Sequence, residues 1–102
     1  KLYNARLDQA THVVLFVQGT TGKPGRLSVF VVPIDTPGLK VERLDAHGLT
    51  GNSYGGVSFD DLFVPDHLRV GEDGEGLKIF HKHFLYWRLM QAAAAIGTGE
   101  NA

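Results

Sequence analysis

The chain has 102 residues, 43% of them hydrophobic, and a formal net charge of −1. This length supports one domain with a modest core, and the near-neutral charge argues against sequence-independent binding to nucleic acid. The absence of cysteine excludes disulfides and thiolate zinc sites and fits a reducing compartment, so we expect a cytoplasmic protein. We also expect no membrane span and no signal peptide, because no apolar run is long enough for the first and the start lacks the apolar region of the second.

The first part of the chain predicts one complete strand. Leu2 and Tyr3 are typical of the end of a strand whose beginning is missing. Residues 11–18 are apolar at both alternating sets of positions, which favours a central strand. Residues 19–25 are rich in glycine and threonine and predict a flexible surface loop.

Residues 27–65 organise the rest of the chain. The run 27–32 is apolar and β-branched, as a buried strand should be, and Pro33 ends it. Pro37 and Gly38 supply a turn. Residues 39–44 and 54–59 alternate apolar with polar residues; Asp60 and Asp61 end the second of these segments. We therefore predict an antiparallel sheet with one dry face, part of a β-sandwich or a small barrel-like domain.

The composition changes after Pro65. Residues 71–76 contain only glycine and acidic residues, which predicts a hinge between a β-domain (1–70) and a helical segment (71–102). From Leu77 the apolar residues follow helical spacing, so we expect mainly β structure with one long C-terminal helix. Gly97 and Gly99 weaken the pattern, and the residues alone predict fraying near Gly97.

No residue pattern indicates a metal site or a catalytic group. His81 and His83 point to opposite sides of a helix and cannot share a metal. The adjacent Asp60 and Asp61 face opposite sides of a strand. The acidic residues within 71–76 would repel a phosphate, and no nucleophile elbow is present.

Three pieces of sequence occur in order along the chain: FVVPIDTPGLKV, then HGLTGNS, then VSFDDLFVPDHLRVGEDGEGLK. Together they resemble the middle β-domain of acyl-CoA dehydrogenases and its exit into the C-terminal helical domain. The resemblance implies an incomplete middle domain, an FAD cofactor, an acyl-CoA thioester substrate and a homo-oligomer. It also implies that the helix continues past Ala102.

The resemblance assigns substrate-binding residues. The segment FLYWR falls on the family's helix start that contacts acyl-CoA, which implies roles for Leu85, Tyr86, Trp87 and Arg88. Arg88 matches the family's arginine, whereas Leu85 replaces a polar residue, and the bulk of Tyr86 and Trp87 narrows the pocket. Trp87 stands where some branched-chain members carry their catalytic glutamate, so we expect no catalytic base here. The residues alone favour another reading, in which Arg88 reaches solvent or pairs with an acid on another helix.

The start of the chain falls on the family's strand that lies against the flavin. The resemblance therefore assigns cofactor contacts to Lys1, Leu2 and Tyr3, and Asn4 matches the family pattern. Lys1 replaces an aromatic residue there. Tyr3 replaces a threonine whose hydroxyl reaches the flavin, and it places its own hydroxyl several ångströms further out.

Three functional hypotheses follow. The chain is part of an FAD-dependent acyl-CoA dehydrogenase-like oxidoreductase, inactive as a fragment and with an unidentified electron acceptor. Alternatively, the same fold carries an acyl-CoA oxidase or a flavin-dependent monooxygenase. A third hypothesis is a non-catalytic β-domain that serves as an interaction module. In each case we expect the helix to leave an apolar stripe exposed.

Overall fold

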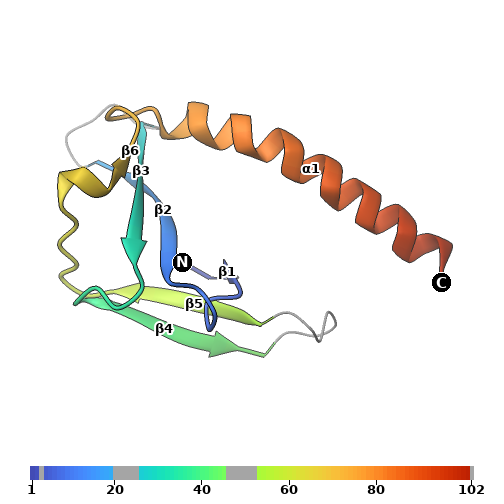
Figure 1. Ribbon diagram of the computed structural model, residues 1–102, viewed down its shortest axis with the longest axis horizontal. Helices are drawn as coiled ribbons and strands as arrows, with labels where there is room; N and C mark the ends of the chain where they lie inside the picture. Colours follow the sequence, from blue (N-terminus) through green and yellow to red (C-terminus); the bar gives the residue numbers. More distant parts are fainter. Residues whose placement is uncertain (3, 20–25, 46–52, 102) are drawn as a thin grey trace. The chain divides into compact units, whose positions relative to one another are not determined.

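The computed structural model describes residues 1–2, 4–19, 26–45 and 53–101. The elements, in order, are β1 (Asn4–Ala5), β2 (His12–Gln18), β3 (Leu27–Pro33), β4 (Leu39–Leu44), β5 (Tyr54–Phe59), η1 (Asp66–Leu68), β6 (Arg69–Val70) and α1 (Gly76–Glu100) (Figure 1). They belong to two units, one of residues Lys1–Leu15 and Phe30–Val70, the other of residues Phe16–Val29 and Gly71–Ala102. The predicted class, mainly β with one C-terminal helix, is confirmed, although the described strands form no closed barrel.

The first sheet has the order β1-β5-β4, and both pairs are antiparallel. Strands β4 and β5 lie side by side over their whole length (Figure 1), with Leu39 opposite Phe59 and Leu44 opposite Tyr54. In β4 only Leu39 is buried, and Val41 is exposed together with the charged residues of the strand, whereas β5 turns Val57 into the core. This is the antiparallel pairing that the sequence predicts for residues 39–59.

The link between β3 and β4 is a tight turn. The Pro33 carbonyl accepts hydrogen bonds from the Thr36 backbone nitrogen at 3.2 Å and from Thr36 Oγ1 at 2.7 Å. Gly38 has a φ of 89°, the left-handed region in which glycine alone is unstrained. The sequence prediction of a turn at this glycine is confirmed.

The second sheet has the order β2-β3-β6, so β3 is its middle strand and β2 lies at one end of the described sheet. The prediction of a central strand at residues 11–18 is therefore wrong. Val13 and Leu15 are buried, but Val14 is 45% and Val17 is 40% exposed. An apolar residue on an exposed strand face is common, and so a continuous apolar run does not by itself identify a central strand.

The core of the first unit is small and aliphatic. Val32 of β3 is fully buried and lies at its centre. The core cluster consists of Leu7, Val13, Leu15, Val32, Leu39 and Val57, with Phe30, Ile34, Leu62 and Val64 packed against it.

Helix α1 is continuous from Gly76 to Glu100 and ends with the Asn101 backbone nitrogen bonded to the Thr98 carbonyl. It runs through Gly97, so the fraying that the residues alone predict there is not seen, and the continuation past Ala102 that the resemblance implies stays a prediction. A Cβ at Gly97 or Gly99 would contact nothing within 4 Å. Among the described residues, no helix is long and apolar enough to cross a membrane.

Candidate functional site

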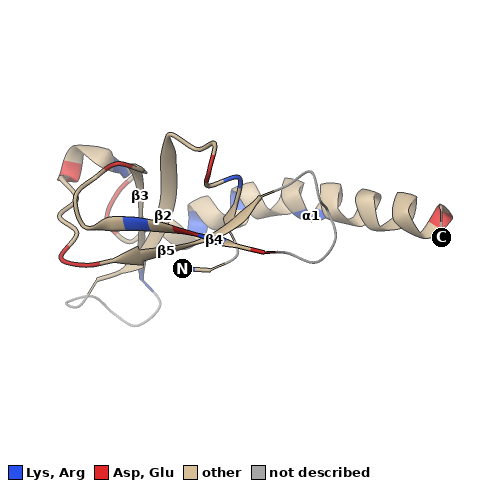
Figure 2. Ribbon diagram, turned by 90° about the horizontal axis from the view of Figure 1, so that it is seen from below, with Lys and Arg blue, Asp and Glu red and all other residues tan. Residues whose placement is uncertain are grey.

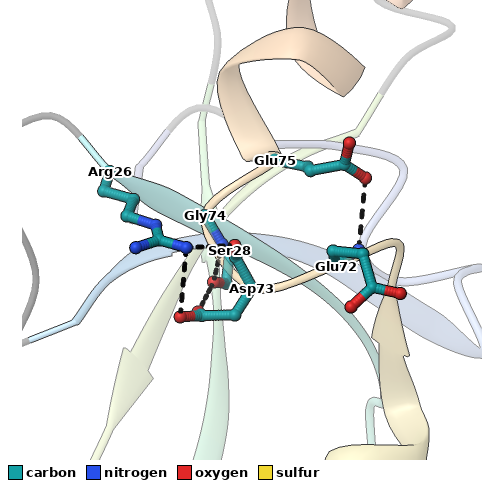
Figure 3. Close-up of polar contacts among 6 residues, drawn as sticks. All are labelled: Arg26, Ser28, Glu72, Asp73, Gly74 and Glu75. Atoms are coloured by element: carbon teal, nitrogen blue, oxygen red, sulfur yellow. Dashed lines mark hydrogen bonds and ion pairs between the residues drawn. The ribbon is translucent and has the colours of Figure 1, made fainter.

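The start of α1 is held by polar contacts to the beginning of β3 (Figure 3). Ser28 Oγ donates to Asp73 Oδ1 at 2.6 Å and accepts from the Gly74 backbone nitrogen at 3.0 Å. Arg26 Nη2 donates to the Asp73 carbonyl at 2.9 Å and lies 3.9 Å from Asp73 Oδ2. The segment that the sequence predicts to be a hinge is thus bonded to β3 immediately before α1 begins.

Glu75 completes this junction. Its Oε2 accepts a hydrogen bond from the Glu72 backbone nitrogen at 3.2 Å, and its Oε1 accepts one from Lys78 Nζ at 2.9 Å. These bonds and the attraction to the Lys78 ammonium lower the pKa of the Glu75 carboxyl below its ordinary value of 4.5, the Lys78 bond contributing most. The carboxylate therefore closes the turn that leads into α1.

An aromatic column runs along one face of α1. Phe80 stacks on Phe84 with ring centroids 4.7 Å apart, and Trp87 follows Phe84 at 5.6 Å. Phe16 of β2 meets Phe80 edge to face at 5.6 Å. Such pairs add to the free energy of burying the rings, so the column fixes which side of α1 faces β2.

The four predicted substrate-binding residues are exposed and lie at the C-terminal end of this column, of which Trp87 is a member. Leu85 is 65%, Tyr86 71% and Trp87 45% exposed, and Arg88 is also exposed. At about 100° per residue, Trp87 lies about 60° to one side of Phe84 and Arg88 about 40° to the other. Leu85 lies at the flank of this face and Tyr86 on the opposite side of the helix. Trp87 and Arg88 therefore lie about 100° apart on the two sides of Phe84, and Leu85 lies closer to Arg88, at about 60°.

The charged residues of α1 are basic over nearly its whole length. Between Gly76 and Gly99 the helix has no acidic residue, whereas Lys78, Lys82 and Arg88 are basic. Figure 2 shows the basic residues in blue along α1 and an acidic one in red only at its C-terminal end. The Arg88 guanidinium thus has no carboxylate on its own helix within reach, and an anion near it would meet no repulsion from α1.

Two of the three predicted cofactor-binding residues, Lys1 and Leu2, lie beside β5. The Lys1 backbone nitrogen donates to the Val57 carbonyl at 2.8 Å, and the Val57 nitrogen donates to the Lys1 carbonyl at 2.7 Å. Lys1 Nζ donates to the Val14 carbonyl at 2.9 Å, and desolvation lowers the pKa of this side chain from its ordinary value of 10.5. Leu2 is 61% exposed, and its side chain lies over Gly56. Tyr3 lies outside the described residues.

The two predicted sets of residues belong to different units, Lys1 and Leu2 to the first and residues 85–88 to the second. No group of three or more potential metal ligands occurs within the described ranges. The sequence interpretation missed Ser28 and Asp73. The available signal was a serine inside an otherwise apolar strand, since a buried hydroxyl needs a partner.

The chain was compared with known proteins. No protein-family profile matches it. The human mitochondrial short-chain specific acyl-CoA dehydrogenase is 34% identical over 77 residues, which cover 74% of this chain and 19% of that protein. A probable acyl-CoA dehydrogenase of Mycobacterium bovis is 35% identical over 91 residues, covering 88% of this chain and 14% of that protein.

A solved structure matches as well. Butyryl-CoA dehydrogenase from Megasphaera elsdenii superimposes with a TM-score of 0.71 at 25% identity, covering 78% of this chain and 21% of that one. The chain spans about a fifth or less of the length of these three proteins. Because sequence and fold agree over most of its residues, the chain belongs to the acyl-CoA dehydrogenase family and corresponds to one segment of such a protein.

Proposed function

We propose that the chain is part of an FAD-dependent oxidoreductase that introduces an α,β double bond into an acyl-CoA thioester. The observation that supports this most is the match to acyl-CoA dehydrogenases over 74–88% of the chain, together with the fold shared with butyryl-CoA dehydrogenase. In this proposal residues 1–70 are part of the middle β-domain, and residues 71–102 begin the helical domain.

Arg88 is proposed to contact the anionic acyl-CoA. Its guanidinium is exposed, it shares a helix face with Phe84, and α1 places no acid beside it. A guanidinium binds carboxylates and phosphates through two parallel hydrogen bonds, which suits an anionic carrier. Leu85, about 60° from Arg88, and Trp87, about 100° from it, present apolar surface for the acyl chain, and Tyr86, on the side of the helix opposite Arg88, is proposed to lie further from the ligand.

The exposed residues at the start of the chain offer chemical groups that suit FAD. The Leu2 side chain offers apolar surface to a planar ring, and Lys1 Nζ keeps two donors after its bond to Val14. The backbone groups of Lys1 are used by Val57 and would not reach the cofactor. We propose that Lys1 and Leu2 contact the flavin, with Tyr3 next to them in sequence. When bound, the flavin would accept the hydride that leaves the substrate.

The exposed apolar residues of α1 support an oligomer as a further part of the proposal. Leu89, Met90 and Ile96 are 64–70% exposed, and no charged residue lies among them. An exposed apolar face of this kind is typical of an interface. A homo-oligomer of the complete protein would bury it.

The complete protein that contains this segment provides the test. We expect its absorption spectrum to show a bound flavin that bleaches when butyryl-CoA is added without oxygen, with an enoyl-CoA as product. Slow reoxidation of that flavin by oxygen is expected of a dehydrogenase, whereas rapid reoxidation would indicate an oxidase or a monooxygenase instead. A protein with no flavin absorption would refute the proposal and favour an interaction module.

The contribution of Arg88 is tested in the same protein. Arg88→Ala is expected to raise KM for butyryl-CoA at least about tenfold, because a charge-assisted hydrogen bond contributes about 1.5–3 kcal/mol. Arg88→Lys keeps the charge but not the planar fork of donors, so its KM should lie between those of the native protein and of Arg88→Ala. Lys82→Ala, a basic residue on the same helix, is the matched control and should leave KM unchanged.

A further inference from the structure

Ser28 makes two hydrogen bonds to the segment that precedes α1. Its side chain is buried, with only 8% exposed, and its hydroxyl both donates to Asp73 Oδ1 and accepts from the Gly74 nitrogen. A buried hydroxyl that loses such partners costs free energy. The segment is therefore held in one arrangement relative to β3.

Arg26 strengthens this attachment from outside. It donates to the Asp73 carbonyl, and its side chain lies so close over Gly74 that a Cβ there would collide with it. The ion pair itself is weak, because both side chains are more than half exposed and lie 3.9 Å apart. The contribution of Arg26 thus comes from the backbone hydrogen bond and from covering Gly74 (Figure 3).

Helix α1 begins directly after these contacts. A Cβ at Gly76 would lie 2.5 Å from the Leu27 carbonyl oxygen, so the first residue of the helix sits against the first residue of β3. One turn later, Phe80 meets Phe16 of β2. A helix fixed at two successive turns cannot rotate about its axis, and this rotation decides where Trp87 and Arg88 point.

We propose that Arg26, Ser28 and Asp73 form a clamp that positions Trp87 and Arg88 by fixing the rotation of α1. They are positioning residues and do not touch the ligand themselves. The assignment of Arg88 to acyl-CoA comes from the proposed function, and the effect of the clamp on ligand binding rests on it.

Ser28→Ala in the 102-residue chain tests the clamp. Exchange of the Gly74 amide hydrogen should become at least about tenfold faster, since the amide loses its acceptor. The contact between the Phe16 and Phe80 rings, followed by NMR, should weaken, because rotation of α1 carries Phe80 away from Phe16. Ser28→Thr keeps the hydroxyl and should restore both properties. Thr98→Val removes a hydroxyl bonded to the Ala94 carbonyl far along α1 and should change neither.

An unchanged contact between the Phe16 and Phe80 rings in a folded Ser28→Ala chain would overturn the proposal, whether or not the Gly74 amide exchanges faster. If Ser28→Ala does not fold, Arg26→Ala decides by the same two measurements, because its side chain is exposed and its removal leaves the core intact.

A titration with butyryl-CoA, monitored by Trp87 fluorescence, tests the effect of the clamp on ligand binding. Binding to the native chain that weakens several-fold in Ser28→Ala would support positioning of the ligand site. Equal affinity in the two chains would overturn that part of the proposal. No saturable binding to the native chain would refute the proposed role of Arg88, while amide exchange and the contact between the Phe16 and Phe80 rings would still decide the clamp.

Discussion

At the scale of single residues, Gly38 is a position where both the backbone conformation and the lack of space oppose a side chain. Its φ is 89°, and an added Cβ would lie 2.5 Å from the Asp60 carbonyl oxygen and 3.0 Å from Leu62 Cα. Both atoms belong to the backbone, so neither can move aside like the end of a side chain. We expect Gly38→Ala to lower the free energy of unfolding by more than about 2 kcal/mol, measured by urea denaturation.

Gly97→Ala is the matched control for this prediction. An added Cβ there meets nothing within 4 Å, and the residue lies inside α1. Removing a helical glycine should raise the helix content on far-ultraviolet circular dichroism and add about 0.5–1 kcal/mol of helix stability. Similar effects of the two substitutions would show that the Gly38 backbone is not constrained as described.

The same residues show what sequence can predict. The turn at Gly38 was predictable because it depends on neighbouring residues, with Pro37 and Gly38 supplying the two required φ values. The bond from Ser28 to Asp73 was not, because its partners are 45 residues apart and each residue type is common in loops. The contact of Phe80 with Phe16 likewise joins residues 64 positions apart in the chain, so the side of α1 that is covered there was not predictable.

At the scale of elements, the junction before α1 carries a pH dependence. The pKa of Glu75 is lowered in the folded chain, so its carboxylate stabilises the fold at pH above 4.5, and this stabilisation is lost as the pH falls through the lower folded value. We expect carbon NMR to show Glu75 titrating below pH 4.5. Lys78→Gln should move this titration back toward 4.5, because it removes the strongest contact.

Lys82→Gln provides the comparison for Lys78→Gln. Lys82 lies one turn further along α1, seven residues from Glu75, and its removal changes the net charge by the same amount. The Glu75 titration should stay as in the native chain. A shift as large as that in Lys78→Gln would mean that overall charge, and not the hydrogen bond, sets the pKa of Glu75.

The positions of the strands and of the helix along the chain were predicted better than the pairing of the strands in the sheets. Strands β2, β3, β4 and β5 and helix α1 fall where the apolar patterns indicate, because alternation and helical spacing are local properties. The order β2-β3-β6 was not predictable, since pairing depends on segments far apart in the chain. The helix continued through Gly97 because the cost of a single glycine is small over 25 residues.

At the scale of the whole molecule, we expect the 102-residue chain to be catalytically inactive when supplied with FAD and butyryl-CoA. Removal of the substrate α-proton needs a base within hydrogen-bond reach. Helix α1 has no carboxylate between Gly76 and Gly99, and the indole of Trp87 cannot accept a proton. Reduction of an electron-accepting dye, followed by absorbance against a blank without protein, should therefore stay at background. The complete protein under the same conditions is the positive control. Turnover by the chain above the blank would show that a base lies among its own residues and would reopen the assignment of roles along α1.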